Sequence, residues 1–257
     1  MKWTRRDILK GLGGLPIAGG IWWAGAAHSA FNTKERTEIL EQLNIEPSLT
    51  TSLPAIGGKP LRVGIIGFGI RGNHLCRALG FVENPTSEHL DTQKELNVQL
   101  VAVCDSFDVR AENAIAWFST DETKVKRYDT HQEMIRSGQV DAVIIATPDH
   151  WHAPIAIDAL EHDIHTYVEK PMTHTIEETY RLKEAAERSN ALLMVGHQHR
   201  QTLSFKTAQD VVNKGTLGHI SVIQTNTNRN SDNGAWQYKI HAKASEQTIN
   251  WKQFLGS

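Results

Sequence analysis

The sequence has few cysteines, no excess of charge of either sign, and no long apolar run beyond its first 30 residues. Its two cysteines, Cys76 and Cys104, are too few for a disulfide framework or a four-thiolate zinc site. The 27 basic residues nearly balance the 29 acidic ones, so no basic excess favours nucleic-acid binding. After residue 30, no stretch of about 18 uncharged apolar residues predicts a membrane span. With 257 residues, 40% of them hydrophobic, the chain can form one large or two smaller globular domains.

The first 30 residues have the pattern of an export signal. A basic start precedes 17 uncharged residues at 11–27, and Ala24-Gly25-Ala26 offers the small residues of a cleavage site. The Arg5-Arg6 pair resembles the bacterial twin-arginine signal, with Ile8 where that signal usually has Phe.

We therefore expect residues 1–30 to direct export to the periplasm and residues 31–59 to form a polar linker. An N-terminal membrane anchor is the alternative, although 17 residues that include glycines and a proline are short and weakly apolar for a span. After removal of the signal, no stable membrane span is expected.

A strand, a glycine-rich turn and a helix follow one another from residue 61. The apolar, β-branched run at 61–66 predicts a buried strand. It leads into a GxGxxG pattern formed by Gly67, Gly69 and Gly72, and 73–81 has apolar residues at helical spacing. In a dinucleotide-binding unit the first glycine permits the turn, the second admits the pyrophosphate, and the third lets the helix pack closely. The pattern therefore predicts a dinucleotide-binding unit.

A second strand, at 98–104, ends at Asp105. A carboxylate at this position accepts hydrogen bonds from the adenosine ribose and repels a 2′-phosphate, which favours NAD over NADP. Asp105 lies 33 residues after Gly72, whereas about 20 is usual. The polar stretch 83–97 is interpreted as an inserted loop that takes up the difference. A surface aspartate that merely ends a strand is the alternative.

Strands and helices continue to alternate as far as residue 195. We expect helices at 110–118, 130–137, 153–161 and 175–188, the last opened by a capping box, and strands at 142–146, 166–168 and 192–195. This alternation predicts an α/β fold over 60–200: a Rossmann-type, doubly wound parallel sheet with right-handed crossovers. Ligands bind at the carboxyl ends of such strands. Polar tips gather there: the glycine turn, Asp105, 147–152, 169–171 and 197–200.

Lys170 is the candidate catalytic residue. It follows an apolar strand at such a tip, is preceded by Glu169, and is held by Pro171, whose ring fixes φ. A partly buried lysine beside a dinucleotide could exchange a proton with a substrate hydroxyl while hydride leaves the same carbon. A solvated loop lysine paired with Glu169 is the alternative.

Three motifs in this order resemble the Gfo/Idh/MocA oxidoreductases: the glycine turn, the TPxxxH pattern at 147–152, and the EKP tripeptide at 169–171. The sequences EKPMTHT at 169–175 and GHQHR at 196–200 are similar to the exported branch of this family in sugar-degrading bacteria. The resemblance covers roughly 60–257.

The resemblance implies an NAD-dependent oxidoreductase that acts on a sugar or cyclitol hydroxyl. It implies that Lys170 is the catalytic lysine and that Glu169 lies near the nicotinamide. The residues that it implies around the cofactor are Gly67, Phe68, Gly69, Arg71, Gly72, Asp105, Thr147, His152, Glu169 and Lys170. A tightly held cofactor would fit with twin-arginine export, which carries folded proteins.

Family members continue into an open sheet that covers the cofactor and supplies a downstream histidine for proton transfer. Here 203–213 predicts a linking helix and 220–228 the first strand of an α+β substrate domain within 201–257. The 40 residues from 218 fall below the usual floor of about 50 for a domain, so we expect a C-terminally truncated chain. His241 is interpreted as a polar loop residue near Trp236, and no second acid/base is assigned. A homo-oligomer formed through the sheet domain stays open.

No metal site is expected. His150/His152 and His197/His199 are each spaced i, i+2, but no cysteine or acidic pattern completes a set of three or four ligands. The two cysteines are expected to be buried free thiols.

Two other functions stay open. The first is redox-neutral, NAD-dependent glycoside hydrolysis, an exception to the two-carboxylate scheme. The second is a dinucleotide-binding chain without catalysis. Release of stoichiometric NADH would separate a dehydrogenase from the glycosidase.

Overall fold

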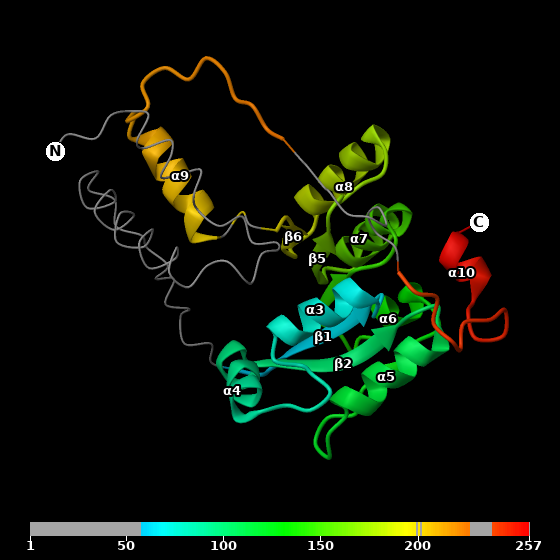
Figure 1. The fold of residues 1–257 in the computed structure, drawn as a ribbon. Helices are drawn as coiled ribbons and strands as arrows, with labels where there is room; N and C mark the ends of the chain where they lie inside the picture. The colour runs from blue at the N-terminus through cyan, green and yellow to red at the C-terminus, as the bar shows by residue number, and fades with distance from the viewer. Residues whose placement is uncertain (1–57, 199, 201, 227–237, 257) are drawn as a thin grey trace. The chain divides into compact units, whose positions relative to one another are not determined.

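The computed structural model describes residues 58–198, 200, 202–226 and 238–256 (Figure 1). The expected export signal, most of the linker, His199 and Trp236 lie outside the described residues. The described residues divide into two compact units, one formed by 58–197 with 238–256, the other by the described residues of 198–226.

The first unit is built on a six-stranded sheet in the order β3-β2-β1-β4-β5-β6. Neighbouring strands of this sheet pair in parallel, and this is the order of a Rossmann fold. The strands are β1 (Leu61–Ile66), β2 (Val98–Cys104), β3 (Lys126–Arg127), β4 (Ala142–Ile145), β5 (His165–Glu169) and β6 (Leu193–Gly196). The predicted doubly wound parallel sheet is confirmed.

The register of the sheet brings the ends of its central strands together. Ile66, the last residue of β1, pairs with Cys104 at the end of β2 and with Ile145 at the end of β4. The residues that follow these three strands therefore begin side by side, at the place where the strand order reverses. In open α/β sheets ligands bind at this switch point.

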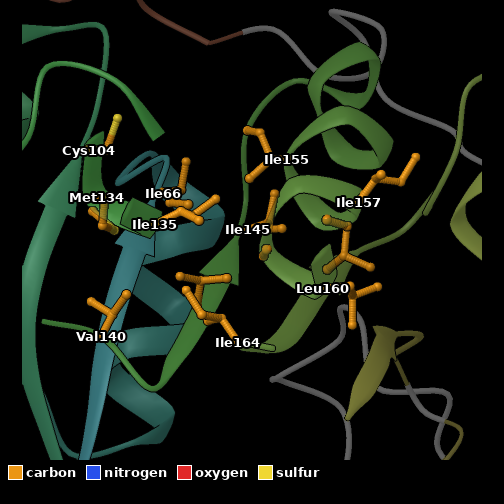
Figure 2. Packing of buried hydrophobic residues seen from close by; sticks show 14 of the residues in the cluster. Ile66, Cys104, Met134, Ile135, Val140, Ile145, Ile155, Ile157, Leu160 and Ile164 are labelled. Carbon is orange, nitrogen blue, oxygen red and sulfur yellow. The ribbon is translucent and has the colours of Figure 1, made fainter. Parts of the chain in front are cut away.

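Helices cover both faces of the sheet. Buried residues of α3 (Ile70–Ala78) and α5 (Asp108–Phe118) belong to one hydrophobic cluster. Those of α6 (His131–Arg136), α7 (His152–Glu161) and α8 (Ile176–Arg188) belong to the other. Figure 2 shows Met134 and Ile135 of α6 and Ile155 of α7 packed with Ile66 and Ile145 of the sheet. Burying each such aliphatic side chain contributes about 1.5–3 kcal/mol, so this packing fixes the helices on the sheet.

Two elements differ from the sequence predictions within the first unit. The expected loop at 83–97 contains α4 (Ser87–Leu96), which begins after a capping box at Thr86 and ends at Asn97 with φ 49°. None of its residues is buried, so it lacks the apolar stripe that marks a helix in the sequence. The two-residue strand β3 was also missed. The capping box of α8 at Thr175 and Glu178 is confirmed.

The second unit contains α9 (Leu203–Asn213), at the bounds that its sequence predicts. The first strand expected at 220–228 is not formed over 220–226, and 227–228 lie outside the described residues. Val222 and Ile223 are 80% and 82% exposed. A strand needs a neighbouring strand for its backbone hydrogen bonds, and no strand of the described ranges pairs with this stretch.

Residues 238–256, named here the C-terminal strap, pack with the Rossmann unit. The strap ends in the short helix α10 (Trp251–Leu255), visible at the red end of the chain in Figure 1. Among the described residues, no helix is long and apolar enough to cross a membrane.

Candidate active site

Two glycines of the turn after β1 are required by the protein's own packing. Gly67 has φ +89°, and a Cβ atom there would lie 2.7 Å from the Ala146 carbonyl oxygen. A Cβ on Gly72 would lie 2.1 Å from the Gly67 carbonyl oxygen. The turn therefore lies directly against the end of β4, and α3 lies directly against the turn.

Gly69 differs, because the packing of the protein leaves space beside it. It is the N-cap residue of α3 and makes no side-chain cap. A Cβ on Gly69 would meet only the guanidinium of Arg110, at 3.5 Å. The first amide groups of a helix bind phosphate, and the second glycine of such a turn lets the backbone approach a pyrophosphate. The space at Gly69 thus fits a dinucleotide.

Asp105 ties the glycine turn to the end of β2. Its carboxylate is 7% exposed and accepts hydrogen bonds from the backbone N–H groups of Phe68 (2.7 Å) and Phe107 (2.8 Å). Burial raises the pKa of Asp105, opposed by these two hydrogen bonds and by the charges of Arg110 and Arg127. A carboxylate has about four acceptor positions, so Asp105 retains capacity for ribose hydroxyls.

Phe68 contributes its backbone N–H to the site, through the hydrogen bond to Asp105. Its ring is 4% exposed and lies edge-on to Phe118, with 5.3 Å between centroids. The side chain therefore belongs to the hydrophobic core between α5 and the sheet.

Arg71 and Glu169 join the glycine turn to the tip of β5. Arg71 Nε donates to Glu169 Oε1 at 2.6 Å. The buried Glu169 carboxylate also accepts from the hydroxyl of Tyr167 and the backbone N–H of Lys170. Burial and the nearby Glu169 raise the pKa of Tyr167. Glu169 thus pairs with Arg71, whereas a solvated pair of Glu169 with the Lys170 ammonium was one sequence-based alternative.

Lys170 carries an exposed side chain at this tip. The partial burial considered from the sequence is therefore not supplied by the described residues. The Lys170–Pro171 peptide bond is cis. Lys170 is placed at the edge that carries the glycine turn, through its neighbour Glu169.

His152 links the tips of β4 and β5. Its side chain is 3% exposed, with Nδ1 2.6 Å from the Pro171 carbonyl oxygen and Nε2 2.9 Å from that of Thr147. A neutral imidazole donates to one carbonyl, and a protonated ring donates to both. Both ring nitrogens thus face backbone carbonyl groups of the protein itself. Thr147 Oγ1 is buried without a hydrogen-bond partner among the described residues. The cofactor contacts implied for His152 and Thr147 stay predictions.

The C-terminal strap spans the tips of β2, β3 and β4. Asn250 N donates to Ser106 O at 2.7 Å, and Gln253 Nε2 to Asp129 O at 2.6 Å. The ring nitrogens His150 Nε2 and Trp151 Nε1 lie 3.0 and 3.2 Å from Phe254 O. The sequence pattern did not predict this return to the Rossmann unit. Its one local signal is an N-cap: the side chain of Asn250 accepts from Gln253 N.

The described histidines do not gather into a metal-binding cluster. In the part of the chain that the structure describes, no group of three or more His, Cys, Asp or Glu residues could hold a metal ion. His241 lies within the strap, with its ring edge-on to Phe107 at 5.4 Å. Both cysteines are free and buried, as predicted, and burial raises the pKa of each to about 12.

Comparison with known proteins agrees with this geometry. A family model described as an oxidoreductase family with an NAD-binding Rossmann fold matches residues 61–197. A glycosyl hydrolase family 109 protein of Shewanella woodyi is 29% identical over 185 residues, covering 68% of this chain and 34% of the relative. An alpha-N-acetylgalactosaminidase of Shewanella oneidensis is 32% identical over 141 residues, covering 52% of this chain and 28% of the relative.

The solved structures include myo-inositol 2-dehydrogenase from Lactobacillus plantarum, at 26% identity and a TM-score of 0.52. That match covers 63% of this chain and 43% of the dehydrogenase. The chain spans about a third of the length of the first curated relative, 34%. The matched range begins at β1 and ends just after β6, so it contains the glycine turn, Asp105 and the EKP tip. By this match over more than half of its length, the chain belongs to the Gfo/Idh/MocA family of oxidoreductases, whose Rossmann fold binds NAD.

Proposed function

We propose that this chain is the NAD-binding part of an oxidoreductase that acts on a sugar or cyclitol hydroxyl, with Lys170 as the acid/base. The observation that carries the proposal is the 2.6 Å ion pair between Arg71 Nε and Glu169 Oε1. Arg71 lies in the first turn of α3, beside the phosphate-binding glycines, and Glu169 directly precedes Lys170. The ion pair thus holds the candidate catalytic lysine at the cofactor edge.

The residues divide the work of this reaction. The helix N-terminus at Gly69 binds the pyrophosphate, and Asp105 binds the ribose hydroxyls. NAD, when bound, supplies the hydride acceptor. Lys170 would accept the proton of the substrate hydroxyl as the carbon that bears this hydroxyl gives its hydride to NAD, and it would return a proton in the reverse direction. Arg71 neutralises the buried Glu169, so the Lys170 amine stays available to substrate.

The relatives support the substrate class. One is named a myo-inositol dehydrogenase, and another an alpha-N-acetylgalactosaminidase. A cyclitol and a hexosamine both present secondary hydroxyls on a six-membered ring, which is the group that Lys170 would serve.

The test is turnover by the oxidoreductase of which this chain is the NAD-binding part, with NAD and a panel of sugars and cyclitols, followed by NADH absorbance. We expect NADH formation with at least one compound, and its loss in Lys170→Met. Lys183→Met is the matched control, because Lys183 is an exposed lysine that pairs with Glu187 on the same helix, α8. Equal turnover by Lys170→Met and the unchanged protein would overturn the role of Lys170.

Redox-neutral glycoside hydrolysis is the second candidate, and the two glycosidase-named relatives favour it. Oxidation of a sugar hydroxyl would be followed by elimination of the glycosidic group, addition of water and reduction. Release of a chromogenic aglycone without net NADH would identify this reaction. Binding of NAD without either product would instead identify a dinucleotide-binding chain that does not catalyse.

We propose further that residues 1–30 export the protein by the twin-arginine route with NAD bound. Fractionation of bacteria that express the chain should find it in the periplasm, and an Arg5→Lys, Arg6→Lys double variant should remain in the cytoplasm. Recovery in the membrane fraction would favour the N-terminal anchor. Purified mature protein without bound NAD would contradict loading before export. A homo-oligomer of the protein is tested by its mass in solution.

A further inference from the structure

Arg110, which belongs to none of the motifs recognised in the sequence, lies over the glycine turn. A Cβ atom on Gly69 would lie 3.5 Å from Arg110 Nη1 and 3.7 Å from Cζ. The guanidinium carbon also lies 5.7 Å from the centroid of the Phe107 ring, which is itself buried. The first turn of α5 thereby places a fixed positive charge beside the N-terminus of α3.

Among the described residues, no carboxylate forms an ion pair with Arg110. Three other arginines of the Rossmann unit have close carboxylate partners: Arg62 pairs with Asp141, Arg71 with Glu169, and Arg127 with Asp108. Over the described ranges, the Arg110 guanidinium makes no hydrogen bond and no ion pair. Its effect on the protein is at longer range, where its charge lowers the pKa of Asp105.

The glycine turn itself supplies little positive charge to a ligand. Its own arginine, Arg71, is held by Glu169, so the turn offers a phosphate the uncapped amide groups of α3 rather than a side-chain cation. A dinucleotide brings a pyrophosphate with two negative charges to this helix end. Arginine suits phosphate because its planar fork can donate two parallel hydrogen bonds.

We propose that Arg110 binds the pyrophosphate of NAD, as a cation added from α5 to the amide groups of the glycine turn. The assignment rests on the proposed NAD binding. It gives the space at Gly69 a second wall: the α3 amides lie on one side of the phosphates and the Arg110 guanidinium on the other.

The experiment measures binding of NAD and ADP by calorimetry, and of adenosine by displacement of NADH fluorescence. Arg110→Gln removes the charge, and Arg110→Lys keeps it without the fork. Arg77→Gln is the matched control. Arg77 is an exposed arginine in the last turn of α3, the helix that begins at Gly69, and it lies roughly 12 Å along the helix axis from Gly69. We expect Arg110→Gln to weaken NAD and ADP roughly tenfold, the loss of one charge-assisted contact. Adenosine should bind unchanged.

The other variants sharpen the result. Arg110→Lys should recover part of the loss, and Arg77→Gln should bind all three ligands like the unchanged protein. Equal NAD affinity in Arg110→Gln and the unchanged protein would overturn the assignment of Arg110 and leave the proposed NAD binding intact. A loss for adenosine as large as that for ADP would place Arg110 on the adenosine half of NAD and would also overturn the assignment. An unchanged protein that binds neither NAD nor ADP would overturn the proposed function, and this assignment with it.

Discussion

Replacement of His152 by alanine should destabilise the Rossmann unit while its neighbour His150 tolerates the same change. His152 is 3% exposed and lies between the carbonyl oxygens of Thr147 and Pro171, at 2.9 and 2.6 Å from its ring nitrogens. His150 is half-buried and contacts one carbonyl, that of Phe254, at 3.0 Å. The two histidines are two residues apart on the same tip, so they form a matched pair.

The size of the effect follows from these hydrogen bonds. Leaving a buried hydrogen-bonding group without its partner costs about 1–3 kcal/mol. In His152→Ala a buried carbonyl group loses its donor and the buried ring leaves a cavity, while water that enters the vacated space restores part of the loss. We expect a net loss of about 3 kcal/mol, a large part of the roughly 5–15 kcal/mol that stabilises a domain. His150→Ala removes a single, partly exposed hydrogen bond and should cost about 1 kcal/mol or less.

Urea unfolding followed by circular dichroism measures both variants. For a slope of about 2 kcal/mol per molar urea, His152→Ala should lower the midpoint by roughly 1.5 M. His150→Ala should lower it by about 0.5 M or less. Equal midpoints for the two variants would refute the reasoning that His152 joins the tips of β4 and β5.

Three further predictions concern the turn, pH and the thiols. Gly72→Ala places a Cβ 2.1 Å from the Gly67 carbonyl oxygen and should cost about 3 kcal/mol of stability by overpacking, measured by the same urea titration; an unchanged midpoint would contradict that contact. Burial lowers the pKa of His131 below 6.5. Because the unfolded chain then binds more protons near that pH, stability should fall as the pH drops through about 6.5. His131→Gln should show a shallower fall, and equal slopes would count against burial as the cause. Burial raises the pKa of Cys76 and of Cys104 to about 12, so both thiols should react slowly with a thiol reagent in the folded protein. Removal of residues 238–257 should speed the reaction of Cys104 only, because its sulfur accepts a hydrogen bond from Gln253 of the strap. Faster reaction of both thiols would indicate general unfolding instead.

The sequence predicts the sheet well because its strands carry local signals. Each main strand is an apolar run that ends at a distinctive residue: Gly67 after β1, Asp105 after β2, Thr147 near the end of β4. The parallel register then brings these ends together without further information. The main strands of the parallel sheet, and the edge of the sheet that carries the candidate site, could therefore be predicted from these local signals.

The interactions that organise the site could not be predicted in the same way. The hydrogen bonds of His152 to two carbonyls, the pair of Arg71 with Glu169 and the approach of Arg110 to Gly69 join residues from different elements. The strap interactions link residues more than 100 positions apart, as in the hydrogen bond of Trp151 to Phe254. None of these interactions leaves a periodic pattern in the sequence.

The most direct measurement is calorimetric binding of NAD to residues 31–257, with NADP beside it and Gly69→Ala as the variant. A Cβ on Gly69 meets only the Arg110 guanidinium, so this variant should unfold at the same urea concentration as the unchanged protein. It should bind NAD at least roughly tenfold more weakly, because the new methyl group occupies the place of the phosphates. Selective binding of NAD, weakened at least roughly tenfold in a stably folded Gly69→Ala, is the predicted result. Equal binding by the two proteins, or no binding by a folded unchanged chain, would contradict the account.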